Sequence, residues 1–94
     1  MVSITVKQVK EEVVSQAAAH LAALLRQHLG NRVMGPEFPN VARVRNHYLK
    51  KIMVRFAVGE AVGEGKRIIM KCADDTLKEK TFSGVRIVFD ADPQ

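Results

Sequence analysis

The residues best suited to chemistry are cations that recur at alternate positions between residues 43 and 55. Odd positions in this segment carry a basic side chain at five places: Arg43, Arg45, His47, Lys51 and Arg55. Side chains two residues apart on a β-strand lie about 6–7 Å apart, close to the spacing of phosphates along a nucleic-acid strand. Arginine grips a phosphate through two hydrogen bonds, and lysine adds a mobile point charge. The spacing therefore predicts that one strand face binds nucleic acid.

The charge of the chain is concentrated in the same region. Residues 32–55 hold six Lys or Arg and one acid, so they carry 6 − 1 = +5, which equals the net charge of all 94 residues. Arg32 and Lys50 are the further candidates for contact within this range. A solvated sheet face is the alternative, but such a face normally mixes both signs. The imbalance favours a polyanionic partner.

Other reactive residues are better explained by structure than by chemistry. The single Cys72 excludes an intrachain disulfide and a cysteine-based zinc site. The glycines of residues 59–65 lead to Lys66-Arg67, without the Ser or Thr that a phosphate loop places after its lysine, so they predict a flexible turn. We expect no catalytic residue, metal site or cofactor in this chain. The pairs that we interpret as structural are His20 with His28, Asp74 with Asp75, and Asp90 with Asp92.

The elements that must position the cations follow from hydrophobic periodicity. Ninety-four residues suit one domain, 1–94. A period near 3.6 predicts helices over 11–29 and, after a glycine-containing turn, up to Leu77. A period of two predicts strands over 3–10, 31–35, 42–56 and 85–91. Because the third of these strands is long, we expect a bulge near Asn46 or Lys50.

This order of elements, β-α-β-β-α-β, predicts an α+β fold with two layers. Two helices should pack on one face of a four-stranded, mainly antiparallel sheet. Tyr48 falls among apolar even positions and is expected to pack in the core, which leaves the basic odd positions on the open face. No apolar run approaches the roughly 20 residues of a membrane span, and no signal peptide is evident, so a cytoplasmic protein is expected.

Three motifs together resemble one protein family. They are Met34-Gly35-Pro36 with Pro39, the segment Arg43-Val44-Arg45-Asn46-His47-Tyr48, and the ending Val85 to Pro93. In this order they resemble the C-terminal domain of the bacterial primosomal protein N′ family, the replication-restart helicases known as PriA. The chain departs from the family pattern after Tyr48, where Leu49 and Lys50 replace an arginine and an aromatic residue, and at Phe89, where aspartate is frequent.

The resemblance implies a module that recognises forked DNA during replication restart and primosome assembly in the bacterial cytoplasm, near the nucleoid. It also implies a fold similar to a small 30S ribosomal protein. The parent would be an ATP-dependent 3′-to-5′ DNA helicase that uses ATP, Mg²⁺ and zinc outside these residues. Implied partners are the helicase core, single-strand-binding protein and other primosome proteins.

Two other functions are compatible with the residues. A protein-interaction module could use the cations to dock an acidic partner. A ribosomal-type domain could use them to bind RNA. An independent enzyme is disfavoured because no constellation of catalytic residues can be assembled from the sequence.

Overall fold

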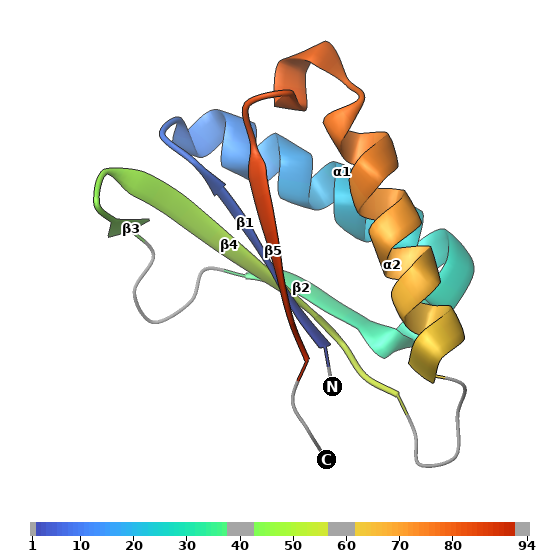
Figure 1. The fold of residues 1–94 in the computed structure, drawn as a ribbon. Helices are drawn as coiled ribbons and strands as arrows, with labels where there is room; N and C mark the ends of the chain where they lie inside the picture. The colour runs from blue at the N-terminus through green and yellow to red at the C-terminus, as the bar shows by residue number, and fades with distance from the viewer. Residues whose placement is uncertain (1, 38–42, 57–61, 92–94) are drawn as a thin grey trace.

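A computed structural model describes residues 2–37, 43–56 and 62–91. No helix within these ranges is long and apolar enough to span a lipid bilayer. The described residues form two α-helices, two short 3₁₀ turns and five strands (Figure 1). In order they are β1 (Val2–Gln8), α1 (Glu11–Leu29), η1 (Gly30–Arg32), β2 (Val33–Glu37), β3 (Arg43–Val44), β4 (His47–Val54), α2 (Val62–Leu77), η2 (Lys80–Phe82) and β5 (Arg86–Ala91).

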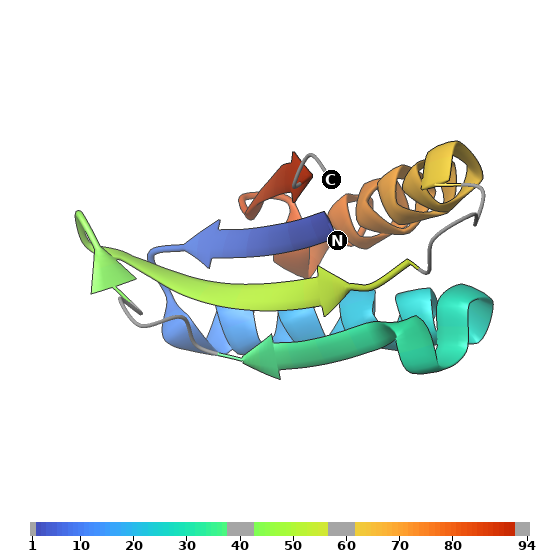
Figure 2. The same ribbon diagram turned by 90° about the horizontal axis from the view of Figure 1, so that it is seen from below.

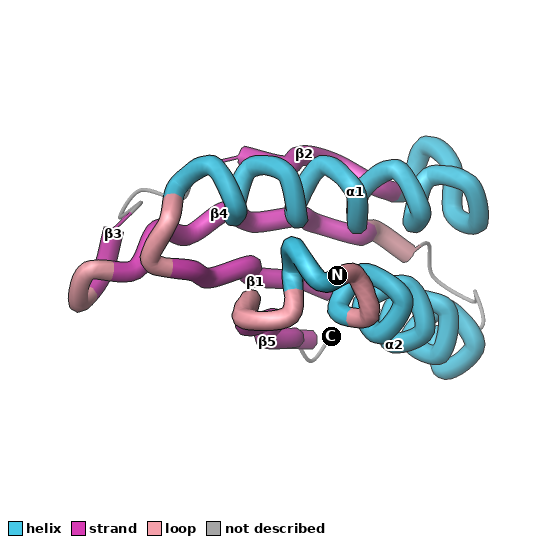
Figure 3. The backbone as a smooth tube through the Cα atoms, turned by 90° about the horizontal axis from the view of Figure 1, so that it is seen from above, coloured by secondary structure: helices cyan, strands magenta, loops and turns pink. Residues whose placement is uncertain are grey.

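The four main strands form an antiparallel sheet in the order β2-β4-β1-β5, and the short β3 pairs with β4. Strand β4 lies between β1 and β2, and β1 lies between β4 and β5. Each helix therefore connects two parallel strands that are separated by a third, and two such split units interlock in the ferredoxin-like arrangement. The predicted α+β fold, with two helices on one sheet face, is confirmed (Figure 3).

Helix α1 has the predicted bounds and the caps that its sequence suggests. Glu11 and Glu12 lie in its first turn, where the helix dipole favours negative charge. Gly30 ends it at φ +58°, and its N–H donates to the carbonyl oxygen of Arg26. The apolar stripe of α1 is buried against the sheet and α2, through Val14, Ala17, Ala18, Leu21, Ala22, Leu25 and Leu29.

The sheet has a buried face and an open face. Val2, Ile4 and Val6 of β1 point into the core, where they join Ile52 and Val54 of β4. The alternate residues Ser3, Thr5 and Lys7 therefore point to the side that no helix covers. Figure 2 is drawn from that side, with the strands in front of α1. This open face is the surface on which a binding site can be displayed.

Helix α2 begins within the glycine segment that the sequence assigned to a flexible turn. Gly63 and Gly65 both lie in its first turn. Gly65 is buried, and a Cβ at this position would clash with the ring of Phe56. The missing side chain thus makes room for an aromatic ring against the helix. This close packing explains a glycine that otherwise weakens a helix.

Candidate nucleic-acid interface

The basic segment is a hairpin and not one long strand. Arg45 and Asn46 have positive φ values of 51° and 67°, and they separate β3 from β4. Arg43 pairs with Tyr48, and Val44 pairs with His47. Two central residues with positive φ define a type I′ turn, the turn that best matches the twist of antiparallel strands. Asparagine tolerates this conformation, so Asn46 was the sequence signal for the hairpin.

The predicted single basic face is therefore wrong, because the turn reverses the chain. Arg43 shares a face with Tyr48, its partner across the hairpin. Lys51 lies three residues beyond Tyr48 in a regular strand, so it points to the opposite face. The expected bulge near Lys50 is also wrong, since pairing of β4 with β1 is continuous from Tyr48 to Val54. Half-buried Lys50 pairs with Val6 and lies on the helix-covered face.

Two of the predicted contact residues lie at the other end of β4. The backbone N–H of Arg55 donates to the carbonyl oxygen of Arg32 at 2.9 Å, just beyond the pairing of Val33 with Val54. Both side chains are exposed. The eight residues of β4, which span roughly 23 Å from end to end, lie between this pair and the hairpin turn. Arg32 and Arg55 therefore do not belong to the same local site as Arg43 and Arg45.

The hairpin is tied together by its own side chains. The guanidinium carbon of Arg43 lies 5.4 Å from the centre of the Tyr48 ring, and its Nη2 donates to Oδ1 of Asn46 at 3.2 Å. Nδ1 of His47 lies 3.0 Å from the carbonyl oxygen of Arg45, a hydrogen bond that requires the proton on Nδ1. Tyr48 packs against the core, as expected, while Arg43 covers part of its ring.

Two cations that the sequence analysis missed lie on the open face. Lys7 of β1 pairs with Leu49 on one side and with Arg86 of β5 on the other. The neighbouring row across the sheet is Lys51, Thr5 and Val88. Strands β1 and β5 are far apart in sequence, so only the sheet order places Lys7 beside β4 and Arg86 beside Lys7. We define the basic patch as Lys7, Arg45, His47, Lys51 and Arg86.

The patch has an unbalanced charge. Lys7 and Arg86 are directly opposite each other on neighbouring strands, and like charges in this position destabilise a sheet. None of the five members forms an ion pair with a carboxylate of the described residues. Glu37 pairs with Lys51 in the ladder and is the one acid that flanks the patch on the β2 side. A bound anion would relieve the repulsion between Lys7 and Arg86.

The charge is polarised along the open face. At the end of the open face away from the hairpin, the row of residues across the strands consists of Met34, Met53, Ser3 and Asp90, with one acid and no cation. The acids Glu11 and Glu12 start α1, on the covered side of the sheet. The cations of the open face are therefore gathered toward the hairpin, which extends past the end of β1 (Figure 2).

The chemistry that this arrangement supports is anion binding. Side chains from three strands lie on one uncovered surface, and the exposed Arg45 lies in the adjoining turn, with Arg and Lys as the donors. Among the described residues, no cluster of three His, Cys, Asp or Glu is arranged to hold a metal ion. His20 instead packs its ring 5.7 Å from that of Phe82. Comparison with protein-family models and with curated proteins finds no match for this chain.

Proposed function

We propose that this chain is a noncatalytic DNA-binding domain of a replication-restart helicase, and that the basic patch contacts the phosphates of forked DNA. The observation that carries the proposal is the opposed pair of cations, Lys7 and Arg86, beside Lys51 on a sheet face without a helix cover. Repulsion between such neighbours is offset when a polyanion lies across them. The hairpin residues Arg45 and His47 extend the same surface.

Phosphate contact is the mode of binding that these residues support. Tyr48 is half-buried and Arg43 lies over its ring, so this tyrosine does not offer an open stacking surface. Phosphate contacts position a protein on nucleic acid without reading the bases. The domain should therefore discriminate DNA by its shape and its junctions rather than by sequence.

The resemblance to primosomal protein N′ supplies the biological setting of the proposal. The motifs at residues 34–39, 43–48 and 85–93 support it. In this setting the domain belongs to a longer bacterial chain that carries the ATP, Mg²⁺ and zinc sites. It works on nucleoid DNA in the cytoplasm with single-strand-binding protein and other primosome proteins.

The proposal is tested by removing two patch cations together. Arg45→Gln with Lys51→Gln should lower affinity for forked DNA by about tenfold at moderate salt. The slope of log affinity against log salt should also fall, by up to about 1.8 for two lost phosphate contacts. Fluorescence anisotropy over a salt series measures both quantities.

A matched control removes the same charge from the other side of the molecule. Arg67 and Lys71 are exposed on α2, and their double exchange to Gln also lowers the net charge by two. This control should bind almost like the unmodified chain. Exchange of Arg32 and Arg55 to Gln tests the distant pair and should have a smaller effect than the patch variant. Equal losses in all three variants, or displacement of DNA by polyglutamate at matched charge and salt, would contradict the proposed site.

A further inference from the structure

The two edges of the sheet differ in their capacity to accept another strand. Strand β2 forms one edge and contains Pro36, which lacks an N–H, and its pairing is irregular between Met34 and Glu37. Strand β5 forms the other edge and pairs regularly with β1 over six residues, without a proline. Of the described strands, only β1 pairs with it. A regular edge with apolar residues is a template for strand addition.

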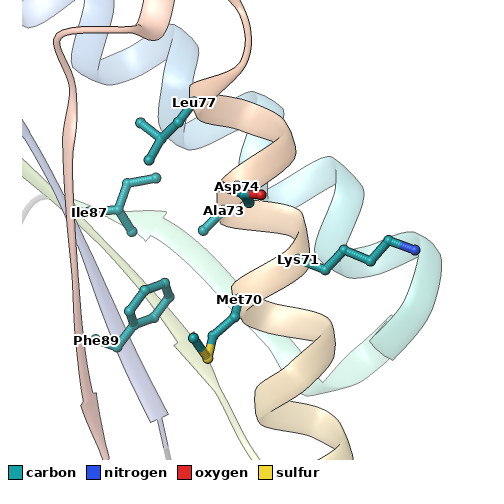
Figure 4. Close-up of a pocket in the computed structure, with 7 residues that line it drawn as sticks. All are labelled: Met70, Lys71, Ala73, Asp74, Leu77, Ile87 and Phe89. Carbon is teal, nitrogen blue, oxygen red and sulfur yellow. The ribbon is translucent and has the colours of Figure 1, made fainter.

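The surface beside β5 is apolar as well. A groove of about 470 Å³ separates β5 from α2, and its lining includes Met70, Ala73, Leu77, Ile87 and Phe89 (Figure 4). Met70 is 62% exposed, Val88 43% and Phe89 40%. Helix α2 packs mainly on α1 and leaves the side chains of Ile87 and Phe89 only partly covered. A partner that adds a strand to β5 would thus also bury this groove.

We propose that the partner is a second copy of this chain, which pairs its own β5 antiparallel to β5 around a two-fold axis at Val88. In that register Val88 faces the partner's Val88, and Ile87 faces the partner's Phe89. On the open face Arg86 faces the partner's Asp90, and Asp90 faces the partner's Arg86. The positions follow from the even spacing of Arg86 and Asp90 around Val88.

Charge complementarity favours a second copy of this chain as the partner. Oppositely charged side chains directly across an antiparallel pair attract each other, and the two-fold axis creates that pair twice. Arg86, which within one copy has the cation Lys7 as its neighbour, gains a carboxylate on its other side. The helix-side residues Ile87 and Phe89 meet their counterparts over the groove. The two open faces then form one continuous eight-stranded surface.

The proposal predicts a charge-swap pattern. Arg86→Asp alone brings four carboxylates to the seam, and Asp90→Arg alone brings four guanidinium groups. Each single variant should dimerise at least about tenfold more weakly than the unmodified chain. An equimolar mixture should recover association as a mixed dimer, because the carboxylates that one variant carries at positions 86 and 90 then face the guanidinium groups of the other. The double variant in one chain should also recover it. Sedimentation equilibrium from micromolar to millimolar protein measures each mass against 10.5 kDa for one chain.

Controls separate the register from general effects on folding. Val88→Asp places two like charges at the axis and should abolish the dimer. Val9→Asp changes a residue of similar exposure, 52%, outside β5 and should leave it intact. Circular dichroism checks that every variant is folded. An unmodified chain that remains monomeric at millimolar concentration overturns the proposal, as does a dimer that persists in both single variants. DNA binding by Arg45→Gln with Lys51→Gln is scored separately, so the two proposals can fail independently.

Discussion

At the scale of single residues, the thiol of Cys72 is controlled by its burial. Its side chain is 3% exposed on the inner face of α2, and its carbonyl oxygen accepts the hydroxyl of Thr76 at 2.9 Å. Burial raises the pKa of this thiol above the ordinary value of 9.0, and the nearby Asp75 adds to the increase. The thiolate is the nucleophile of a cysteine, so the folded thiol should be unreactive near neutral pH.

The raised pKa also links Cys72 to stability. The folded thiol holds its proton more tightly than the unfolded one, so its contribution is complete below pH 9.0 and is lost as pH rises through the folded pKa. The free energy of unfolding of the unmodified chain should therefore fall more steeply above pH 9 than that of Cys72→Ala. Urea titrations at several pH values compare the two slopes, and parallel curves would refute the link.

Among the described glycines, Gly35 is the one whose replacement is most constrained by backbone atoms. Its φ is +98°, and a Cβ would lie 2.8 Å from the carbonyl oxygen of Lys51. Its own carbonyl oxygen accepts a hydrogen bond from Arg26 of α1. Gly35→Ala should therefore destabilise the fold by about 1–3 kcal/mol. Chemical denaturation gives the value.

Gly63 offers the matched control for this exchange. It lies in α2, and a Cβ there meets no atom within 4 Å. Gly63→Ala should stabilise the domain by about 0.5–1 kcal/mol, because alanine favours a helix. The same sign for both exchanges would be inconsistent with the described backbone.

At the scale of elements, the β3–β4 hairpin places a cation at a backbone position that arginine rarely occupies. Arg45 has φ +51° in the turn, where asparagine is preferred. Arg45→Asn should raise the free energy of unfolding by up to about 1 kcal/mol, because it relieves this conformation. The same exchange should weaken binding of forked DNA. Thermal unfolding and anisotropy test the two effects, and a variant that is neither more stable nor weaker in binding would show that Arg45 has no such role.

At this scale, a structural feature can be predicted from the sequence when the signal for it is local. Helix α1 carries its own stripe and caps, so its bounds, Glu11–Leu29, were predicted. The hairpin at Asn46 was missed because alternation of apolar and basic residues is similar in one strand and in two strands joined by a two-residue turn. Gly65 was assigned to a turn because its own segment does not show why a helix would contain a glycine there. The ring of Phe56 packs against it from outside the helix and leaves no room for a side chain.

At the scale of the whole molecule, the composition of the candidate site depends on strand order. The cations of residues 43–55 were identified from one segment of the sequence. In the fold, Arg43 and Lys51 lie on opposite faces of the sheet, and Arg55 lies beyond the end of β4 that is away from the hairpin. Lys7 and Arg86 join the patch from the first and last strands. Charge density along the chain therefore predicts a basic surface, but only the three-dimensional pairing selects its members.

The contrast between the two sheet edges limits how large an assembly of this chain can become. Pairing of β5 with β5 uses the one regular edge of each copy, and the remaining outer edges are both β2, where Pro36 interrupts donation. Further copies would have to join through that proline-bearing strand. Assembly should therefore stop at two subunits. This limit protects a chain with exposed apolar residues at its β5 edge from forming fibres.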